Sequence, residues 1–261
     1  MISKSPQVKS KKKILIIILP AASATREKYA NLLNNLDGLG SIMFVDKGYF
    51  GLGISNQNDL HLLSVVGFFD SLEKKVSEYI FDKLIIVAGS VGAIHAIHFS
   101  IHSRHKSKID SLILGSPAFT KDNKLSYNLK VTILNILLIA NPKIVSVLTN
   151  MFRTAFPKMN IFNDITNVES SIGTKAYLLC LKELVKYSYS NSSKIEGILR
   201  DKAYTLAGKY DMLFEKLCDK NLCQRSEFFE YVHTGHSVLI NKPEVVRELV
   251  SKRIEMINSN L

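Results

Sequence analysis

The stretch LIIVAGSVGAIHAI, residues 84–97, holds a single serine between very small residues. The apolar run before the serine is typical of a buried strand, and the run after it begins a helical pattern. A serine on the sharp turn between a strand and a helix stands above the sheet edge with its hydroxyl exposed. Because such a turn is strained, the residues two positions before and after the serine must have a very small side chain or none. Ala88 and Gly92 meet that demand. The stretch therefore predicts a strand, a turn and a helix that present Ser90.

An aspartate and a histidine follow later in the chain and complete a candidate catalytic set. A serine is a poor nucleophile at neutral pH, so a histidine has to take its proton and later pass it to the leaving group. His236 is the predicted base, and Asp211 is predicted to accept the other ring N–H and hold the tautomer. His233 is the alternative base. The order serine, aspartate, histidine is typical of hydrolases whose serine stands on such a turn.

Length and charge bound the class of protein. The chain has 261 residues, of which 46% are hydrophobic, so it has ample material for the core of one large domain. Its net charge is +11, with a lysine cluster within residues 1–13. No nucleic-acid recognition motif accompanies this charge, which disfavours nucleic acid as a partner. The basic surface suits an acidic acyl carrier protein or an anionic membrane surface, and a merely solvated surface is the alternative.

Three cysteines and two apolar runs bear on the compartment. An odd number of cysteines, Cys180, Cys218 and Cys223, argues against a disulfide scaffold, with a Cys218–Cys223 pair as the alternative. The apolar run 14–19 follows lysines as in a signal peptide, but it is very short and leads into a strand pattern. The apolar stretch 131–148 is too short and too polar to span a bilayer. We therefore expect a cytoplasmic protein without a transmembrane segment.

Strand and helix patterns alternate over most of the chain. Strands are expected at 14–19, 41–45, 84–88, 111–114, 203–207 and 227–231. Helices are expected at about 24–36, 60–79, 91–104, 212–219 and 243–257, the last with Pro243 in its first turn. This alternation predicts an α/β protein with a mostly parallel sheet of about six strands, flanked by helices.

The alternation stops in the middle of the chain. Between Pro117 and Leu199 we find no strand pattern and expect helices at 127–140, 142–154 and 172–189. The sequence thus predicts three parts. They are a flexible basic tail (1–13), an α/β core (14–116 and 200–261) and an inserted helical cap (117–199).

Several polar residues are assigned other roles. The glycine-rich loop 46–55 has neither the Walker pattern nor the dinucleotide-binding pattern, so it is expected to turn tightly beside the site. The pair His95 and His98 has the spacing of metal ligands but no further ligand nearby, so packing or surface roles are favoured over a metal site. Asp82 and Asp110 precede strands and are expected at the edge of the sheet away from the site. No cofactor is expected.

Taken together, residues 14–257 resemble the α/β-hydrolase superfamily, and specifically its esterases and lipases with a helical cap. The turn 88–92, called the elbow below, resembles the family's nucleophile turn with alanine at its first glycine. Gly208 to Asp211 matches the family's Gly-x-x-Asp, and Gly235-His236 matches its Gly-His. The stretch from Asn241 to Val246 and the loop from Asp46 to Ser55 are also similar to family motifs, the loop with extra residues.

The resemblance implies an oxyanion hole and a trimmed sheet. The oxyanion donors are expected to be the backbone N–H groups of Val91 and Ala22. Pro20-Ala21 stands where the family has His-Gly, which alters the loop that carries Ala22. Thirteen residues before Ile14 are too few for the family's antiparallel hairpin, so we expect that hairpin to be missing.

The apolar character of the predicted cap points to the substrate. A cap lined by apolar side chains favours an acyl chain or another lipophilic group, although some of these side chains only pack the cap onto the core. We therefore expect a serine esterase that acts on small lipophilic esters of apolar acyl groups through an acyl-enzyme. A thioesterase or carbon–carbon bond hydrolase with the same triad is one alternative, and a non-catalytic binding protein is another.

Overall fold

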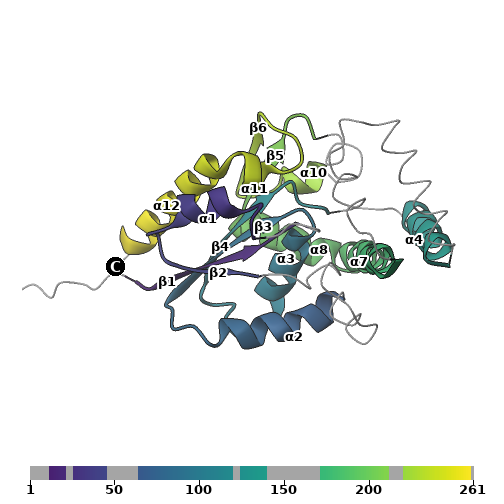
Figure 1. Cartoon of the computed structure of the whole chain (residues 1–261), viewed down its shortest axis with the longest axis horizontal. Coiled ribbons are helices and arrows are strands. Elements are labelled where there is room, and N and C mark those ends of the chain that lie inside the picture. Colours follow the sequence, from purple (N-terminus) through teal and green to yellow (C-terminus); the bar gives the residue numbers. More distant parts are fainter. Residues whose placement is uncertain are drawn as a thin grey trace, which may run out of the picture.

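The computed structural model describes residues 12–21, 26–45, 64–119, 124–139, 171–211 and 220–259. Over this part of the chain six parallel strands form one sheet in the order β2-β1-β3-β4-β5-β6 (Figure 1). The strands are β1 (Ile14–Leu19), β2 (Ser41–Phe44), β3 (Lys83–Gly89), β4 (Ile109–Gly115), β5 (Ala203–Gly208) and β6 (Phe228–Val232). The predicted parallel sheet of about six strands, flanked by helices, is confirmed.

Helices cover both faces of this sheet. One face carries α2 (Val65–Val76), α3 (Gly92–His102) and α8 (Ser192–Lys202), and the other carries α1 (Ala30–Leu36), α11 (Val238–Asn241) and α12 (Pro243–Ser259) (Figure 1). The short α10 (Lys220–Cys223) contacts α8. Successive side chains of a strand point to opposite faces, so β1 contributes to both cores. Leu15, Ile17 and Leu19 join one core, and Ile14, Ile16 and Ile18 join the other.

The helices α1 and α8 differ from the expectation, and the four-residue helices α10 and α11 were not predicted. The predicted helix 24–36 begins only at Ala30, because residues 26–29 form turns with i→i+3 bonds, such as the 3.1 Å bond from the N–H of Tyr29 to the carbonyl of Arg26. Residues 22–25 lie outside the described part. The helix α8 was not predicted, and it buries Ile195 and Leu199 at i, i+4 spacing against the core. The predicted boundary between cap and core at residue 199 falls inside α8.

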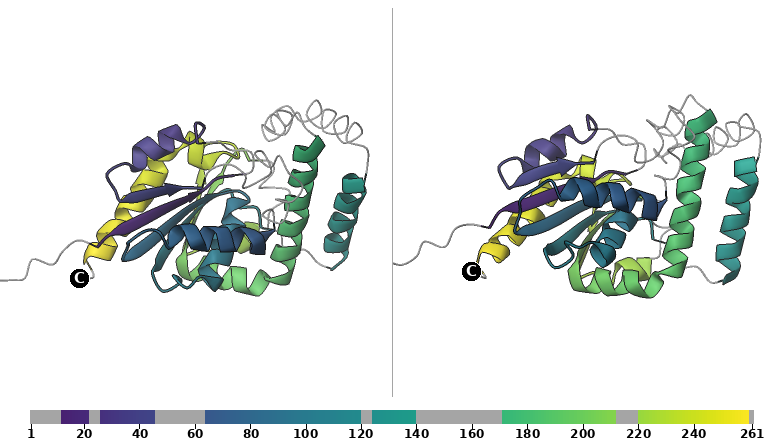
Figure 2. Two further views of the ribbon diagram at one scale, coloured as in Figure 1. Left: turned by 60° about the horizontal axis from the view of Figure 1, so that its bottom comes forward. Right: turned by 90° about the horizontal axis from the view of Figure 1, so that it is seen from below.

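Two helices of the predicted cap are described. Figure 2 shows α4 (Lys124–Ile139) and α7 (Ser171–Ser190) side by side, beyond the carboxyl ends of the strands. The rings of Tyr127 and Tyr189 stack with their centroids 4.1 Å apart and join the two helices. Near its end α7 reaches the core, where Leu184 is buried. The predicted helices 142–154 and 212–219 lie outside the described residues, and the division of the chain into tail, core and cap stays a prediction.

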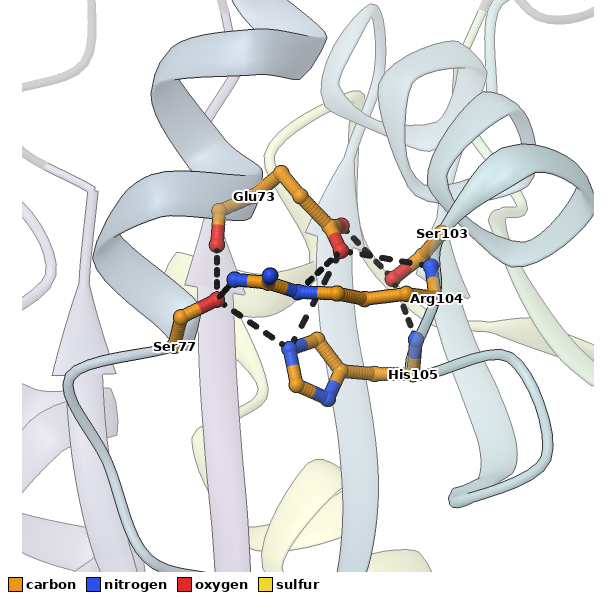
Figure 3. A network of polar contacts seen from close by, with 5 residues as sticks. All are labelled: Glu73, Ser77, Ser103, Arg104 and His105. Carbon is orange, nitrogen blue, oxygen red and sulfur yellow. Dashed lines mark hydrogen bonds and ion pairs between the residues drawn. The ribbon is translucent and has the colours of Figure 1, made fainter.

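A polar network fixes the end of α3 that is remote from Ser90 (Figure 3). One carboxylate oxygen of Glu73, on α2, accepts a 2.7 Å hydrogen bond from Ser103 Oγ. The other lies 3.2 Å from Arg104 Nε and accepts from the backbone N–H of Arg104 at 3.2 Å. Arg104 also donates to Ser77 Oγ. Because Ser103 directly follows α3, these contacts anchor one end of the helix whose other end carries the elbow.

Among the described helices, none has the length and the apolar content needed to cross a bilayer.

Candidate active site

The elbow has the predicted form of a strand, a turn and a helix. Ser90 follows β3, has a φ of 49°, and is followed after one residue by α3. A positive φ is uncommon for any residue other than glycine and costs roughly 1–3 kcal/mol. The N–H of Ser90 donates to the carbonyl of Gly115 at 2.9 Å, which ties the strained residue to β4. The serine is thus held at the carboxyl edge of the sheet.

Glycines at the elbow allow its close approach to the end of β1. A Cβ on Gly92 would lie 2.5 Å from the carbonyl oxygen of Leu19 and 2.8 Å from that of Pro20. A Cβ on Gly89 would lie 3.0 Å from the hydroxyl of Tyr29. The sequence indicated the need for small residues at Ala88 and Gly92, and the structure adds Gly89. The loop after β1 therefore lies directly against the elbow.

Three side chains from different strand ends meet above the sheet. The Nε2 atom of His236 lies 3.0 Å from Ser90 Oγ, and its Nδ1 atom lies 2.7 Å from Asp211 Oδ2. Ser90 follows β3, Asp211 follows β5 and His236 follows β6. The side chain of Asp211 is 1% exposed and that of His236 is 17% exposed, so the aspartate is shielded while the histidine is accessible. The structure thus brings together the three residues that the sequence singled out.

The two contacts of His236 define a direction for proton transfer. An ionised carboxylate only accepts hydrogen bonds, so Asp211 calls for a proton on Nδ1 of His236. The Nε2 atom then carries a lone pair that can accept the proton of Ser90. The hydrogen bond from Nδ1 of His236 to the carboxylate of Asp211 is charge-assisted, and such bonds are among the stronger ones in proteins. It also stabilises the imidazolium that forms when Nε2 takes the proton. The geometry is suited to general-base activation of a serine hydroxyl.

A second strained serine supports the loop of Asp211. Ser116 follows β4, has a φ of 43° and is completely buried. Its Oγ accepts the N–H of Gly208 at 3.3 Å, and the carbonyl of Gly208 in turn accepts the N–H of Asp211 at 3.1 Å. Our sequence reasoning missed Ser116. The available signal was a Gly-Ser pair between the predicted strand 111–114 and Pro117.

The structure places the other candidate residues, His233, Asp82 and Asp110, in contacts outside the set of Ser90, His236 and Asp211. His236, and not His233, stands between Ser90 and Asp211, and His233 is an exposed residue with Nδ1 3.4 Å from the hydroxyl of Tyr210. Asp82 accepts the N–H of Lys13 at the opposite edge of the sheet. Asp110, at the start of β4, forms an ion pair of 2.9 Å with Arg253.

The histidines of α3 are packing residues. Burial, with a smaller contribution from nearby His98, lowers the pKa of His95 to about 3. The ring of His95 lies edge-to-face against Phe68, with centroids 4.8 Å apart. His98 Nδ1 lies 3.0 Å from the hydroxyl of Tyr187 on α7. Within the described residues no cluster of three or more potential ligands could hold a metal ion.

The predicted oxyanion donors are described only in part. Val91 directly follows Ser90 at the start of α3, where backbone N–H groups lack an acceptor within the helix. Ala22 lies outside the described residues, as do the glycine-rich loop 46–55 and Cys218. Cys223 is buried in the core on the α2–α3 face of the sheet.

Comparison with known proteins bears on the fold. No protein-family model and no curated protein sequence matches this chain. Among solved structures, MenH from S. aureus is similar with a TM-score of 0.66 and 14% identity, covering 95% of this chain and 96% of that one. A carboxylesterase structure from Nitrososphaera gargenis has a TM-score of 0.62 and 14% identity, with 96% and 92% covered.

A third similar structure is described as an α/β-hydrolase enzyme. It is MGS-M2, from a Medee basin deep-sea metagenome library, with a TM-score of 0.58, 14% identity, and 97% of this chain and 92% of that one covered. Likeness over nearly the whole length of these chains, at such low identity, is a likeness of fold. This chain therefore has the α/β-hydrolase fold.

Proposed function

We propose that this protein is a serine hydrolase that cleaves carboxylic esters of apolar acyl groups. The observation that carries the proposal is the line of contacts from Ser90 through His236 to the shielded Asp211, with distances of 3.0 and 2.7 Å. Nucleophile, base and orienting acid are then all within hydrogen-bond reach, as this chemistry requires.

The first half of the reaction forms an acyl-enzyme. Ser90 Oγ attacks the ester carbonyl carbon while His236 Nε2 takes the hydroxyl proton, and the carbonyl oxygen becomes a tetrahedral oxyanion. The oxyanion collapses, the bond to the alcohol breaks, and the alcohol leaves with the proton held by His236. Asp211 stabilises the imidazolium between these two steps.

The second half regenerates the serine. A water molecule attacks the acyl carbon while His236 Nε2 takes one of its protons. The second tetrahedral oxyanion collapses, the carboxylic acid leaves, and Ser90 recovers its proton from His236. In both halves we assign the oxyanion to the backbone N–H groups of Val91 and Ala22.

The apolar acyl group is inferred from the predicted cap. On α4 four large apolar side chains are exposed by 47% or more, namely Leu125, Leu129, Ile133 and Ile136. Their spacing puts them along one side of α4, which packs against α7 beyond the carboxyl ends of the strands (Figure 2). Apolar surface in this region supports a lipophilic substrate.

The test is covalent labelling with a fluorophosphonate, which reacts with activated serines. We expect rapid labelling of the native protein and none of Ser90→Ala. A native protein that resists the label would support a non-catalytic binding protein and contradict the proposal. Once labelling is established, matched oxyester and thioester substrates of equal acyl length separate an esterase from a thioesterase by their kcat/KM.

A further inference from the structure

The segment 115–118, at the end of β4, holds the backbone of Ser90 at two points. The N–H of Ser90 donates to the carbonyl of Gly115 at 2.9 Å, and the carbonyl of Ser90 accepts the N–H of Ala118 at 3.2 Å. The two peptide groups that flank the nucleophile are thus bound to one short segment, because β4 lies next to β3 in the sheet. The position of Ser90 therefore depends on the position of this segment.

The same segment is bound to the loop of Asp211 through Ser116. The pairing of β4 with β5 ends at Gly115 and Leu206, and the N–H of Ser116 still donates to the carbonyl of Leu206 at 2.7 Å. Beyond that point a side chain replaces the backbone as the acceptor, since Ser116 Oγ accepts the N–H of Gly208 at 3.3 Å. The hydroxyl of Ser116 therefore extends the connection between β4 and β5 past the end of the paired strands.

Gly208 is in turn connected to both remaining members of the candidate triad. Its carbonyl accepts the N–H of Asp211 at 3.1 Å. A Cβ on Gly208 would lie 2.1 Å from the carbonyl oxygen of Gly235, the residue before His236. The hydrogen bond between Gly208 and Ser116 therefore connects this part of the site with the segment that holds the nucleophile.

We propose that Ser116 is a positioning residue whose hydroxyl holds the loop of Asp211 in its place relative to Ser90. The inference rests on the proposed function, since it is the catalytic triad that needs these two loops in a fixed relation. Ser90 follows β3 and Asp211 follows β5, and β4 is the strand between them in the sheet. Ser116 acts through the backbone of Gly208 and is not itself a catalytic residue.

The burial and the conformation of Ser116 fit this role. Ser116 is completely buried, and a buried N–H without an acceptor is costly, so the hydroxyl meets a need of Gly208. Ser116 also has a φ of 43°, a conformation that glycine adopts more readily than serine. Backbone conformation alone would therefore favour glycine at this position, and the serine contributes the hydroxyl that glycine lacks.

The test is the pair of variants Ser116→Ala and Ser116→Gly. Both lose the hydroxyl, but glycine suits the positive φ better than alanine, so the glycine variant should be the more stable of the two. If the hydroxyl positions the acid, kcat for an ester substrate should fall about 10-fold in both variants with KM changed less than about threefold, because a misplaced catalytic group affects the chemical step. A loss of kcat caused by lower stability would instead be larger in the alanine variant.

A second measurement tests whether the loss runs through Asp211. In the Asp211→Asn background an amide no longer fixes the tautomer of His236, so the placement of its loop matters much less. We therefore expect Ser116→Gly to lower kcat less than about twofold in that background, against about 10-fold in the native protein. A general effect on the fold would be of equal size in both backgrounds.

The matched control is Ser111→Ala. Ser111 lies near the start of the same strand, is also completely buried, and its Oγ has no hydrogen-bond partner within the described part of the chain. We expect this variant to keep the native kcat and at least the native stability, because it removes a buried polar atom that no other group satisfies.

The outcomes separate this inference from the proposed function. A native kcat in both Ser116 variants would overturn the positioning role and leave the triad standing, and so would a loss of equal size in the Asp211→Asn background. Losses that follow the melting temperatures, or an equal loss in Ser111→Ala, would also overturn it. If the native protein neither hydrolyses esters nor reacts with a fluorophosphonate at Ser90, the proposed function fails and this inference fails with it. If Ser116→Ala does not fold, the kcat of Ser116→Gly in the two backgrounds decides.

Discussion

Gly208 and Gly235 touch through their backbones so closely that neither loop has room to move toward the other. A Cβ on Gly208 would lie 2.1 Å from the carbonyl oxygen of Gly235, the residue before His236. The N–H of Tyr210 donates to the carbonyl of Thr234 at 3.0 Å, next to this contact. The loops that carry Asp211 and His236 are therefore held together by backbone contacts, in addition to the contact between their side chains.

We predict that Gly208→Ala lowers both stability and activity, because the new methyl group has to push the loop of His236 away. The matched control is Gly197→Ala in α8, where a Cβ would meet nothing within 4 Å. Replacing a helical glycine by alanine stabilises a helix by up to about 1 kcal/mol. Urea denaturation should show opposite signs for the two variants. A Gly208→Ala protein as stable and active as the native one would contradict the close packing of these loops.

Asp211→Asn should lower kcat by about 10⁴-fold without unfolding the protein, because an amide no longer fixes the tautomer of His236 or stabilises its charged form. Steady-state ester hydrolysis measures this loss, and circular dichroism checks the fold. His233→Ala is the comparison, and we expect it to keep at least half of the native kcat. If His233→Ala proved the more damaging change, the base would have to be reassigned.

Acid should destabilise the fold through His95. Burial, and to a lesser degree His98, holds the pKa of His95 at about 3, whereas an unfolded chain titrates near 6.5. Between these values the unfolded state binds a proton that the folded state does not. The free energy of unfolding therefore falls as the pH drops from 6.5 toward 3, by roughly 1 kcal/mol per pH unit for this group.

Denaturation at several pH values tests this assignment. We expect His95→Leu to lose stability less steeply than the native protein between pH 6.5 and 4, and we expect the exposed-histidine variant His233→Gln to follow the native slope. Identical slopes for the native protein and His95→Leu would show that His95 is not the group responsible.

Much of the fold was predictable because buried parallel strands have a simple signature. Unbroken apolar runs such as Ile14–Leu19 are buried on both faces, and the structure confirms that strand at its predicted bounds. Ser90 was predicted from the small residues of its turn, and Asp211 and His236 from their order along the chain and from motifs that resemble those of the hydrolase family. The structure brings the three together. Their catalytic role is a proposal that awaits experiment.

Other features depend on tertiary contacts that leave little trace in the sequence. Tyr29 lies in the segment expected as a helix at about 24–36, and nothing in that pattern indicates that its hydroxyl accepts the N–H of Ala21, eight residues earlier. Ser116 has a positive φ where its N–H donates to Leu206 of β5, and its place before Pro117 does not by itself predict that conformation. The helix α8 has a weak sequence pattern, because it buries few side chains and contains Gly197.

The most direct measurement is hydrolysis of p-nitrophenyl esters, from acetate to palmitate, by the native protein and Ser90→Ala in parallel. The account predicts native activity that peaks at an intermediate acyl length and falls at least 10⁴-fold in the variant, since the members of a triad act as a unit. Hydrolysis that survives unchanged in Ser90→Ala would contradict the central claim.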